Sequence, residues 1–236
     1  MATSLSIIIP HFRDETALAG LMEQLALPRR RHGIEVIVVD GGNSSVCQGL
    51  CETHSAKYMN LEPNRGKQLL AGAHAATSKT LWFLHADAIV PPDAIEQILT
   101  ARDNGIEAGY FRFSFSGPDL WFKKALAFSV NLRNWLGGVP YGDQGIFVRR
   151  SLYFVACGHA AIPLFEEVSL VSALRRSCRF VQLPFTLPVN PRRWERDGYL
   201  KRTILNRFCA LAFMVRIPSE QINRWYSRRA WLRQGN

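Results

Sequence analysis

Three apolar runs in the N-terminal half of the chain each end in a short polar cluster. The clusters are Pro10-His11-Phe12-Arg13-Asp14-Glu15, Asp40-Gly41-Gly42-Asn43-Ser44 and His85-Ala86-Asp87. In an open parallel sheet, ligands bind outside the carboxyl ends of the strands, where such clusters converge. Carboxylates at that edge accept hydrogen bonds at charge-assisted strength. The spacing therefore predicts a site for a polar ligand at one edge of a sheet.

A basic segment could supply charge for an anionic ligand. Asn64-Arg65-Gly66-Lys67-Gln68 opens a predicted helix, so free backbone N–H groups and the cations of Arg65 and Lys67 could face a phosphate. Gly66 would permit close approach of the backbone. A basic helix start on a solvated surface is the alternative interpretation.

The elements that must position these residues alternate along the chain. Continuous β-branched runs at 5–10 and 34–40 flank a helix predicted over 14–27, as in a βαβ unit with buried parallel strands. Further strands are predicted at 57–60, 80–85, 109–115, 146–148 and 180–183. Further helices are predicted from residue 44, over 66–76, 93–104, 120–135 and 166–176, and from residue 197 onward. This order predicts an α/β fold with a doubly wound, mostly parallel sheet flanked by helices.

Composition narrows the classes of protein. The chain has 236 residues, 47% hydrophobic and 20% charged, which is typical of one globular domain with an appendage. Its first residues predict no signal peptide, and no apolar run approaches the roughly 20 residues of a membrane-spanning helix. Five scattered cysteines without a Cys-x-x-Cys pair favour a reducing, cytoplasmic compartment.

The net charge of +10 is concentrated at the C-terminus. Residues 192–236 hold eleven Lys and Arg against three acidic residues, a balance of +8, so residues 1–191 carry +2. An apolar stripe at helical spacing accompanies this charge, formed by Ile204, Phe208, Leu211 and Val215. Such a segment can cover an acceptor site, pack against a second subunit or lie on an anionic membrane. A docked helical appendage with a solvated basic face is the alternative.

Four ordered motifs carry a family resemblance. IIIPHFRDE, VVDGGNSS, NRGKQLLAGAHAATSKTLWFLHADA and FEEVSLVSALRR resemble glycosyltransferase family 2 proteins of the GT-A fold, over roughly residues 4–195. Among these, the chain looks similar to the short, soluble branch of arsenosugar-biosynthesis type. The resemblance implies a Rossmann-like GT-A domain over 1–195, with a nucleotide-binding half at about 1–106 and an acceptor half at about 107–195. A basic helical C-terminal appendage follows over 196–236.

The resemblance also implies a donor site. Asp40 would receive the base or ribose of the nucleotide, and Pro10 and Glu15 would lie beside it. A helix N-cap or turn residue is the alternative for Asp40. The nucleotide-sugar set is completed by Arg65, Lys67, Asp87 and Arg193.

The metal and catalytic roles follow from the same resemblance. His85-Ala86-Asp87 stands in place of an Asp-x-Asp signature, so Asp87, assisted by His85, would bind a divalent ion, Mn²⁺ or Mg²⁺. Glu166-Glu167 stands in place of a Glu-Asp pair, which makes Glu167 the expected catalytic base and Glu166 its substitute. Acidic residues that simply favour a helix N-terminus are the alternative. The acceptor side is expected at Asp143, Gln144 and Trp194.

The expected activity is metal-dependent, inverting transfer of a sugar from a nucleotide diphosphate donor, a UDP-sugar, to a hydroxyl of a small-molecule or lipid acceptor. A nucleotidyltransferase and a catalytically silent nucleotide-sugar binder are the nearest alternatives. A nucleic-acid-binding module is disfavoured by the acidic strand ends, so no nucleic-acid partner is expected. The C-terminal segment is expected to serve either peripheral membrane contact or homo-oligomer formation.

Overall fold

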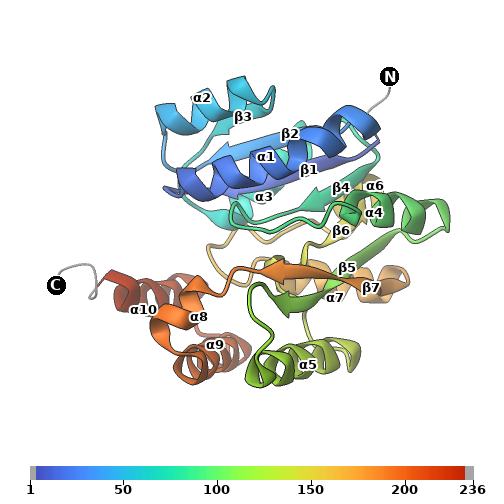
Figure 1. Cartoon of the computed structure of the whole chain (residues 1–236). Helices are drawn as coiled ribbons and strands as arrows, with labels where there is room; N and C mark the ends of the chain where they lie inside the picture. Colours follow the sequence, from blue (N-terminus) through green and yellow to red (C-terminus); the bar gives the residue numbers. More distant parts are fainter. Residues whose placement is uncertain (1–3, 232–236) are drawn as a thin grey trace.

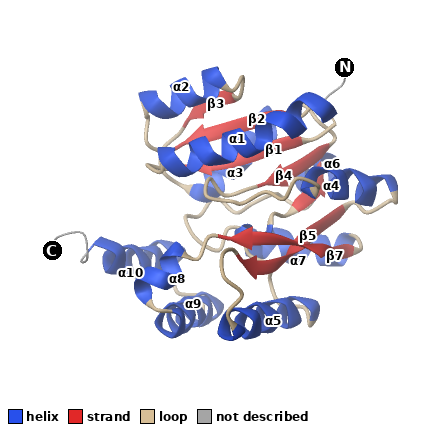
Figure 2. Ribbon diagram, in the orientation of Figure 1, coloured by secondary structure: helices blue, strands red, loops and turns tan. Residues whose placement is uncertain are grey.

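The computed structural model describes residues 4–231, with side chains as far as residue 226. Its core is a seven-stranded sheet in the order β3-β2-β1-β4-β6-β5-β7. The strands are β1 (Ser6–His11), β2 (Glu35–Asp40), β3 (Lys57–Asn60), β4 (Thr80–Phe83), β5 (Ala108–Phe115), β6 (Phe147–Arg149) and β7 (Phe180–Val189). Only β6 runs antiparallel to its neighbours, β4 and β5. The prediction of a mostly parallel α/β sheet is confirmed (Figure 2).

Helices cover both faces of the sheet, and the alternation of strand side chains separates the two cores. The helices are α1 (Glu15–His32), α2 (Ser45–Thr53), α3 (Arg65–Ala75), α4 (Ala94–Asp103), α5 (Trp121–Trp135), α6 (Arg150–Val155) and α7 (Glu167–Ser177). Ile7 and Ile9 of β1 pack with residues of α1, α2 and α4. Ile8 between them packs with residues of α3, α6 and α7. A β-branched run that is buried on both faces thus explains the central strands.

The C-terminal helices form a separate group beside α5. They are α8 (Arg192–Asp197), α9 (Tyr199–Met214) and α10 (Ser219–Trp231). Figure 1 shows α5, α8, α9 and α10 on one side of the molecule, beyond β5 and β7. A small apolar cluster joins α9 and α10 to the segment before α7, through Cys209, Ala212, Ile222 and Phe165.

Several sequence expectations need correction. The strand expected at 180–183 continues to Val189, because it pairs with all of β5 across an irregularity in register. Helix α6 was not predicted, since six residues are too few for a periodic signal. The expected boundary between residues 195 and 196 falls inside α8. The stripe at Ile204, Phe208, Leu211 and Val215 is exposed, and α9 packs through Cys209 and Ala212 instead.

Within residues 4–231, no helix combines the length and apolarity needed to cross a membrane.

Candidate active site

A cavity of about 230 Å³ collects polar residues from segments far apart in the sequence. Its predicted site residues come from the start of α3, the loop after β4, the short 3₁₀ helix η1 (Gly142–Gln144), the start of α7 and α8. They are Arg65, His85, Asp87, Asp143, Gln144, Glu166, Glu167, Arg193 and Trp194. Residues of the helices α5 and α9 also line the cavity. Most of the predicted site is therefore brought into one pocket.

The two glutamates at the start of α7 point into this pocket and have different partners. Phe165, just before them, adopts a left-handed φ of 64°, which is costly for a bulky residue and turns the chain sharply. Glu166 Oε1 forms an ion pair with Arg65 Nε at 2.6 Å. Glu167 Oε1 accepts a hydrogen bond from the backbone N–H of Gly142 at 3.0 Å. Glu167 Oε2 is buried and has no hydrogen-bond partner among the described residues.

The environment of Glu167 favours its protonated form. Burial, together with the neighbouring Glu166 carboxylate, raises the pKa of Glu167 well above the ordinary range for a carboxyl group. Arg65 and the backbone N–H groups at Gly142 and Glu167 lower this pKa only in part. A carboxyl group with a raised pKa and one free oxygen is suited to exchange a proton near neutral pH.

We expect Glu167→Gln to stabilise the protein at alkaline pH. Above the ordinary carboxyl pKa, Glu167 ionises in the unfolded chain while the folded chain still holds the proton, so wild-type stability falls as the pH rises through the raised pKa. Glutamine does not ionise, so at alkaline pH the free energy of unfolding of the variant should exceed that of wild type by about 1–3 kcal/mol. Urea unfolding of both proteins at pH 5 and pH 9 measures this difference. A difference between the two proteins that does not grow with pH would contradict the raised pKa.

Arg65 connects the glutamates to the loop after β4, and two glycines allow it to do so. A Cβ on Gly66 would lie 1.8 Å from the carbonyl oxygen of Ala160, so only glycine lets the start of α3 pack here. A Cβ on Gly142 would lie 2.2 Å from an Arg65 guanidinium nitrogen. Arg65 also donates to Nε2 of His85. Arg65 is therefore part of the pocket, whereas Lys67 of the same segment is exposed.

His85 and Asp87 face each other at the mouth of the pocket. Burial, with the positive charges of Arg65 and Arg193, holds the pKa of His85 well below its ordinary value, so the ring is neutral. Because Nε2 accepts from Arg65, the ring proton lies on Nδ1, which is 3.9 Å from Asp87 Oδ1. The second Asp87 oxygen lies 3.6 Å from the exposed Arg192. The Asp87 carboxylate is thus loosely held and can take a cation, whereas the His85 nitrogen that faces it carries a proton.

Asp143 adds a second carboxyl group near Asp87. Burial raises the pKa of Asp143 to about 6, although Arg65 and Arg133 partly oppose the rise, and the charge of Asp87 adds to it. A divalent cation would relieve this repulsion, since hard cations prefer carboxylate oxygens. Asp87 and Asp143 therefore fit a metal ion that is completed by ligands from substrate.

Asp40 lies outside the pocket, at the buried end of β2. Its two oxygens accept hydrogen bonds from His11 Nδ1 at 2.9 Å and from the backbone N–H groups of Gly42 at 2.9 Å and Ser44 at 2.7 Å. The hydroxyl of Tyr58 lies 3.3 Å from Oδ2. Burial would raise the pKa of Asp40, but these bonds outweigh it and lower the pKa. The carboxylate is bonded by protein groups and shapes the Gly41–Ser44 loop, and its direct contact with a nucleotide stays a prediction.

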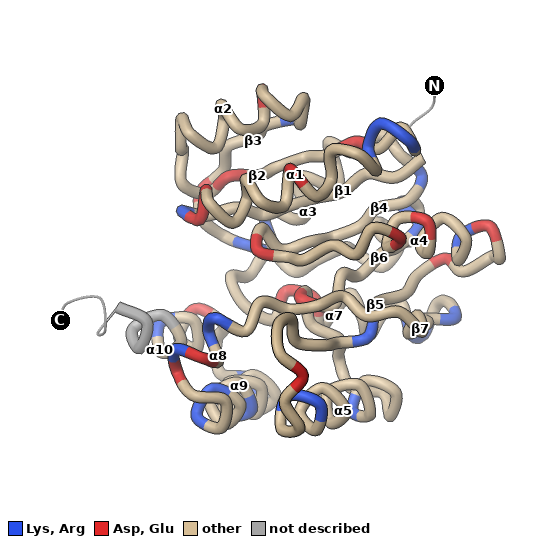
Figure 3. Tube along the Cα trace, in the orientation of Figure 1, with Lys and Arg blue, Asp and Glu red and all other residues tan. Residues whose placement is uncertain are grey.

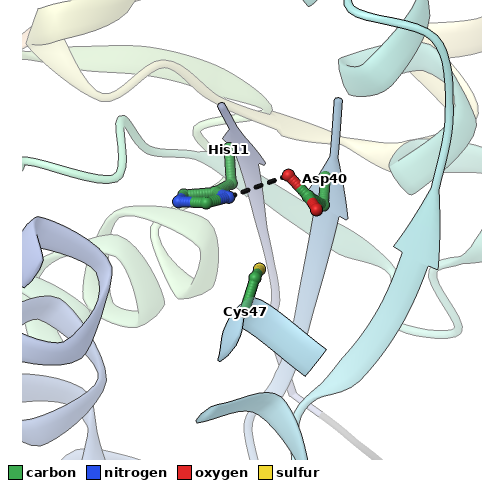
Figure 4. Close-up of side chains that lie close together, drawn as sticks. All are labelled: His11, Asp40 and Cys47. Atoms are coloured by element: carbon green, nitrogen blue, oxygen red, sulfur yellow. Dashed lines mark hydrogen bonds and ion pairs between the residues drawn. The ribbon is translucent and has the colours of Figure 1, made fainter. Parts of the chain in front are cut away.

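His11, Asp40 and Cys47 also bring three metal-ligating atoms within 4.8 Å of one another (Figure 4). The donor set does not fit a metal. His11 uses both ring nitrogens, one toward Asp40 and the other as acceptor for the backbone N–H of Asp14 at 3.2 Å. A hydrogen bond with Cys51 and burial raise the pKa of the Cys47 thiol, whereas metals bind the thiolate. The trio is a packed structural cluster.

We expect Asp40→Asn to destabilise the fold by about 1–3 kcal/mol, the cost of leaving buried donors unpaired. An amide presents N–H groups to at least one of the donors that now face a carboxylate oxygen. Urea unfolding measures the loss, with Tyr58→Phe as the control that removes only the long contact. An unchanged unfolding midpoint with lost UDP binding would instead make Asp40 a direct ligand.

Three of the remaining predicted residues do not line the pocket, and a fourth lines it but is held by other protein groups. Pro10, Glu15 and Lys67 are absent from the pocket lining; Lys67 is exposed, and the other two are half-buried. Gln144 is buried, and its amide is held by Asn134 at 2.6 Å and by the carbonyl oxygen of Phe111 at 3.1 Å, so it fixes the loop.

Several arginines of α5 and α9 that lie at the pocket were not identified from the sequence. Arg133 lines the cavity and lies 5.0 Å from the Tyr141 ring centroid. Arg202 lines it with only 5% exposure, and Arg207 lies on the same helix. No local signal separates these arginines from the other cations of the same helices, such as Lys124 and Lys201.

Comparison with known proteins supports the assignment of this chain to a glycosyltransferase family. The family model described as glycosyl transferase family 2 matches residues 6–165. An uncharacterized glycosyltransferase of Mycobacterium tuberculosis is 33% identical over 106 residues, which is 42% of this chain and 40% of that protein. The match therefore spans less than half of the relative's length.

Solved glycosyltransferases share the fold. Glucosyl-3-phosphoglycerate synthase from Mycobacterium tuberculosis, in complex with Mn²⁺ and UDP-glucose, has a TM-score of 0.60 at 16% identity, covering 92% of this chain and 80% of that one. The mannosyltransferase PcManGT from Pyrobaculum calidifontis, in complex with GDP-mannose and Mn²⁺, has a TM-score of 0.58 at 15% identity, covering 78% and 56%. With the family match over most of the chain, the resemblance seen in the four motifs is confirmed: this chain belongs to glycosyl transferase family 2.

Proposed function

We propose that the chain transfers a sugar, with inversion, from a nucleotide diphosphate donor to an acceptor hydroxyl, and that Glu167 is the general base. The observation that carries the proposal is the buried, unpartnered Oε2 of Glu167, a residue that lines the cavity and whose Oε1 is held by the backbone N–H of Gly142. The acceptor hydroxyl gives its proton to Oε2 as its oxygen attacks the anomeric carbon. The bond from that carbon to the diphosphate breaks on the opposite face, so no covalent intermediate forms.

The other pocket residues suit the leaving diphosphate. Arg65 and Arg193 place two cations in the lining of the pocket that also holds Asp87 and Asp143. A divalent ion bound there would neutralise charge on the diphosphate. Asp87 and Asp143 would hold it, and the Nδ1–H of His85 would steady the Asp87 carboxylate. This assignment replaces His85 as a direct metal ligand.

The donor class is supported by structures of the same fold. Glucosyl-3-phosphoglycerate synthase has been solved with UDP-glucose and Mn²⁺ and with UDP and Mg²⁺, and PcManGT has been solved with GDP-mannose and Mn²⁺. Because the similarity to the UDP-binding enzyme covers 92% of this chain and that to PcManGT covers 78%, we propose a UDP-sugar as the first donor to test.

A nucleotide-sugar panel tests the proposal directly. Thermal unfolding is measured with UDP-glucose, other UDP-sugars and GDP-mannose, each with and without Mn²⁺. A ligand at 100 times its Kd stabilises the folded state by about 2.7 kcal/mol. Donors that bind are then incubated with candidate acceptors, and the anomeric configuration of the product is read by NMR. Absence of stabilisation by every donor in the presence of metal would contradict the proposal.

A further inference from the structure

Helix α5 is built with its apolar side toward solvent. Trp121, Phe128 and Trp135 are 81%, 68% and 72% exposed. The opposite side carries Lys123 and Asn134, which are 5% and 1% exposed. This arrangement reverses the usual pattern of a surface helix in water, in which the apolar stripe faces the core.

Helix α9 also exposes apolar side chains, although its inward side packs apolar residues as well, Cys209 and Ala212. Its inward side carries Arg202, 5% exposed, which lies 3.2 Å from Asp197 and also contacts the Tyr226 hydroxyl. Its outward side and the residue that follows it expose six large apolar side chains: Leu200, Ile204, Phe208, Leu211, Met214 and Val215. Apolar exposure on two helices at once is unusual for a monomer in water and marks an interaction site.

The two helices lie side by side. The Phe122 ring of α5 packs edge-to-face on the Tyr199 ring of α9, with centroids 4.9 Å apart. Both helices lie on the same side of the molecule, away from the β1–β4 part of the sheet (Figure 1). We call the exposed apolar residues of this side the α5–α9 face; they are Trp121, Phe128, Leu132 and Trp135 of α5 and the six residues given above for α9.

The charge beside this face is basic. With about 3.6 residues per turn, the exposed Lys201 and Arg207 fall on opposite margins of the α9 stripe, and the exposed Arg216 follows its end. Lys124 of α5 is also exposed but is paired with Asp119 at 3.0 Å. Figure 3 shows Lys and Arg along both helices. The exposed Trp121 and Trp135 are a residue type enriched at membrane–water interfaces.

We propose that the α5–α9 face docks on an anionic lipid bilayer. Apolar side chains flanked by cations complement a membrane that offers an apolar interior under negative head groups. A second copy of the chain fits less well, because a two-fold contact through this face would bring Lys201 and Arg207 near their own counterparts.

Docking in this way would place the catalytic pocket at the membrane. The cavity reaches between the two helices, where Leu126 and Val130 of α5 and Asn206 and Ala210 of α9 line it. Arg133, Arg202 and Arg207 line the same part. Cations beside an apolar passage suit an acceptor lipid with an anionic head group. This assignment of the acceptor rests on the proposed function, whereas the docking does not.

Vesicle flotation of the full chain tests the docking. Vesicles of phosphatidylcholine with phosphatidylglycerol at about 3:1 are compared with phosphatidylcholine alone. The double variant Trp135→Ser, Phe208→Ser removes two members of the α5–α9 face. The matched control is Leu27→Ser, Val155→Ser, because these residues are 70% and 75% exposed on α1 and α6. Lys201→Glu, Arg216→Glu tests the charge.

We expect wild type and the control pair to float with anionic vesicles, and the face variant and the charge variant to bind about tenfold less. No flotation of wild type at low salt, or equal loss in the control and face variants, would overturn the proposal. The proposal would also be overturned if sedimentation showed that wild type is a dimer and the face variant a monomer, and if neither protein bound vesicles. Donor hydrolysis without lipid is measured separately, so an inactive protein that still floats counts against the proposed function alone. Absence of sugar transfer to an anionic lipid by an otherwise active, floating enzyme would overturn the acceptor assignment.

Discussion

Glu167→Gln is expected to lower kcat by about 10²-fold or more, because a general base contributes about 10²–10⁴ to the rate. Glutamine keeps the side-chain oxygen that can accept from the backbone N–H of Gly142, so the shape of the pocket is preserved. It loses only the carboxylate that takes the proton. A group that acts in the transition state changes kcat and leaves donor affinity nearly intact. Steady-state kinetics combined with calorimetric titration of the donor separates the two.

Glu166→Gln is the control for this result. Glu166 is as deeply buried as Glu167, but its carboxylate holds Arg65 at 2.6 Å. Its loss should loosen Arg65 and raise the KM for the donor more than it lowers kcat. If Glu166→Gln abolishes turnover while Glu167→Gln retains it, the two roles are exchanged and the base assignment is wrong.

Local sequence signals explain the N-terminal half of the fold. The runs before Pro10 and Asp40 are β-branched and continuous, and they fold as β1 and β2 because parallel strands are buried on both faces. The motif order then predicted the pocket around Arg65, Asp87 and Glu167, and these residues do converge. Such signals are local, so one sequence is enough to find them.

Other features depend on contacts that no local pattern contains. The apolar stripe of α9 has the period of a helix, but the period does not tell which side faces the protein. The orientation is defined by long-range contacts of the inward side, the packing of Cys209 and Ala212 and the ion pair of Arg202 with Asp197. Likewise, Asp40 stands where a ligand contact was expected, and only the three-dimensional placement of His11 and Ser44 shows that its oxygens are already used.

Asp87→Asn is expected to abolish most of the activity and most of its dependence on a divalent ion. The amide lacks the negative charge that attracts the ion, although it has nearly the same size as the carboxylate. His85→Asn is the control: because the Asn amide can still donate toward Asp87, it should retain much more activity than Asp87→Asn. Donor affinity and turnover are measured for both variants across a Mn²⁺ titration, and wild type is measured in excess chelator. Full turnover of wild type in chelator would contradict any metal role, and equal losses in the two variants would make His85 a metal ligand after all.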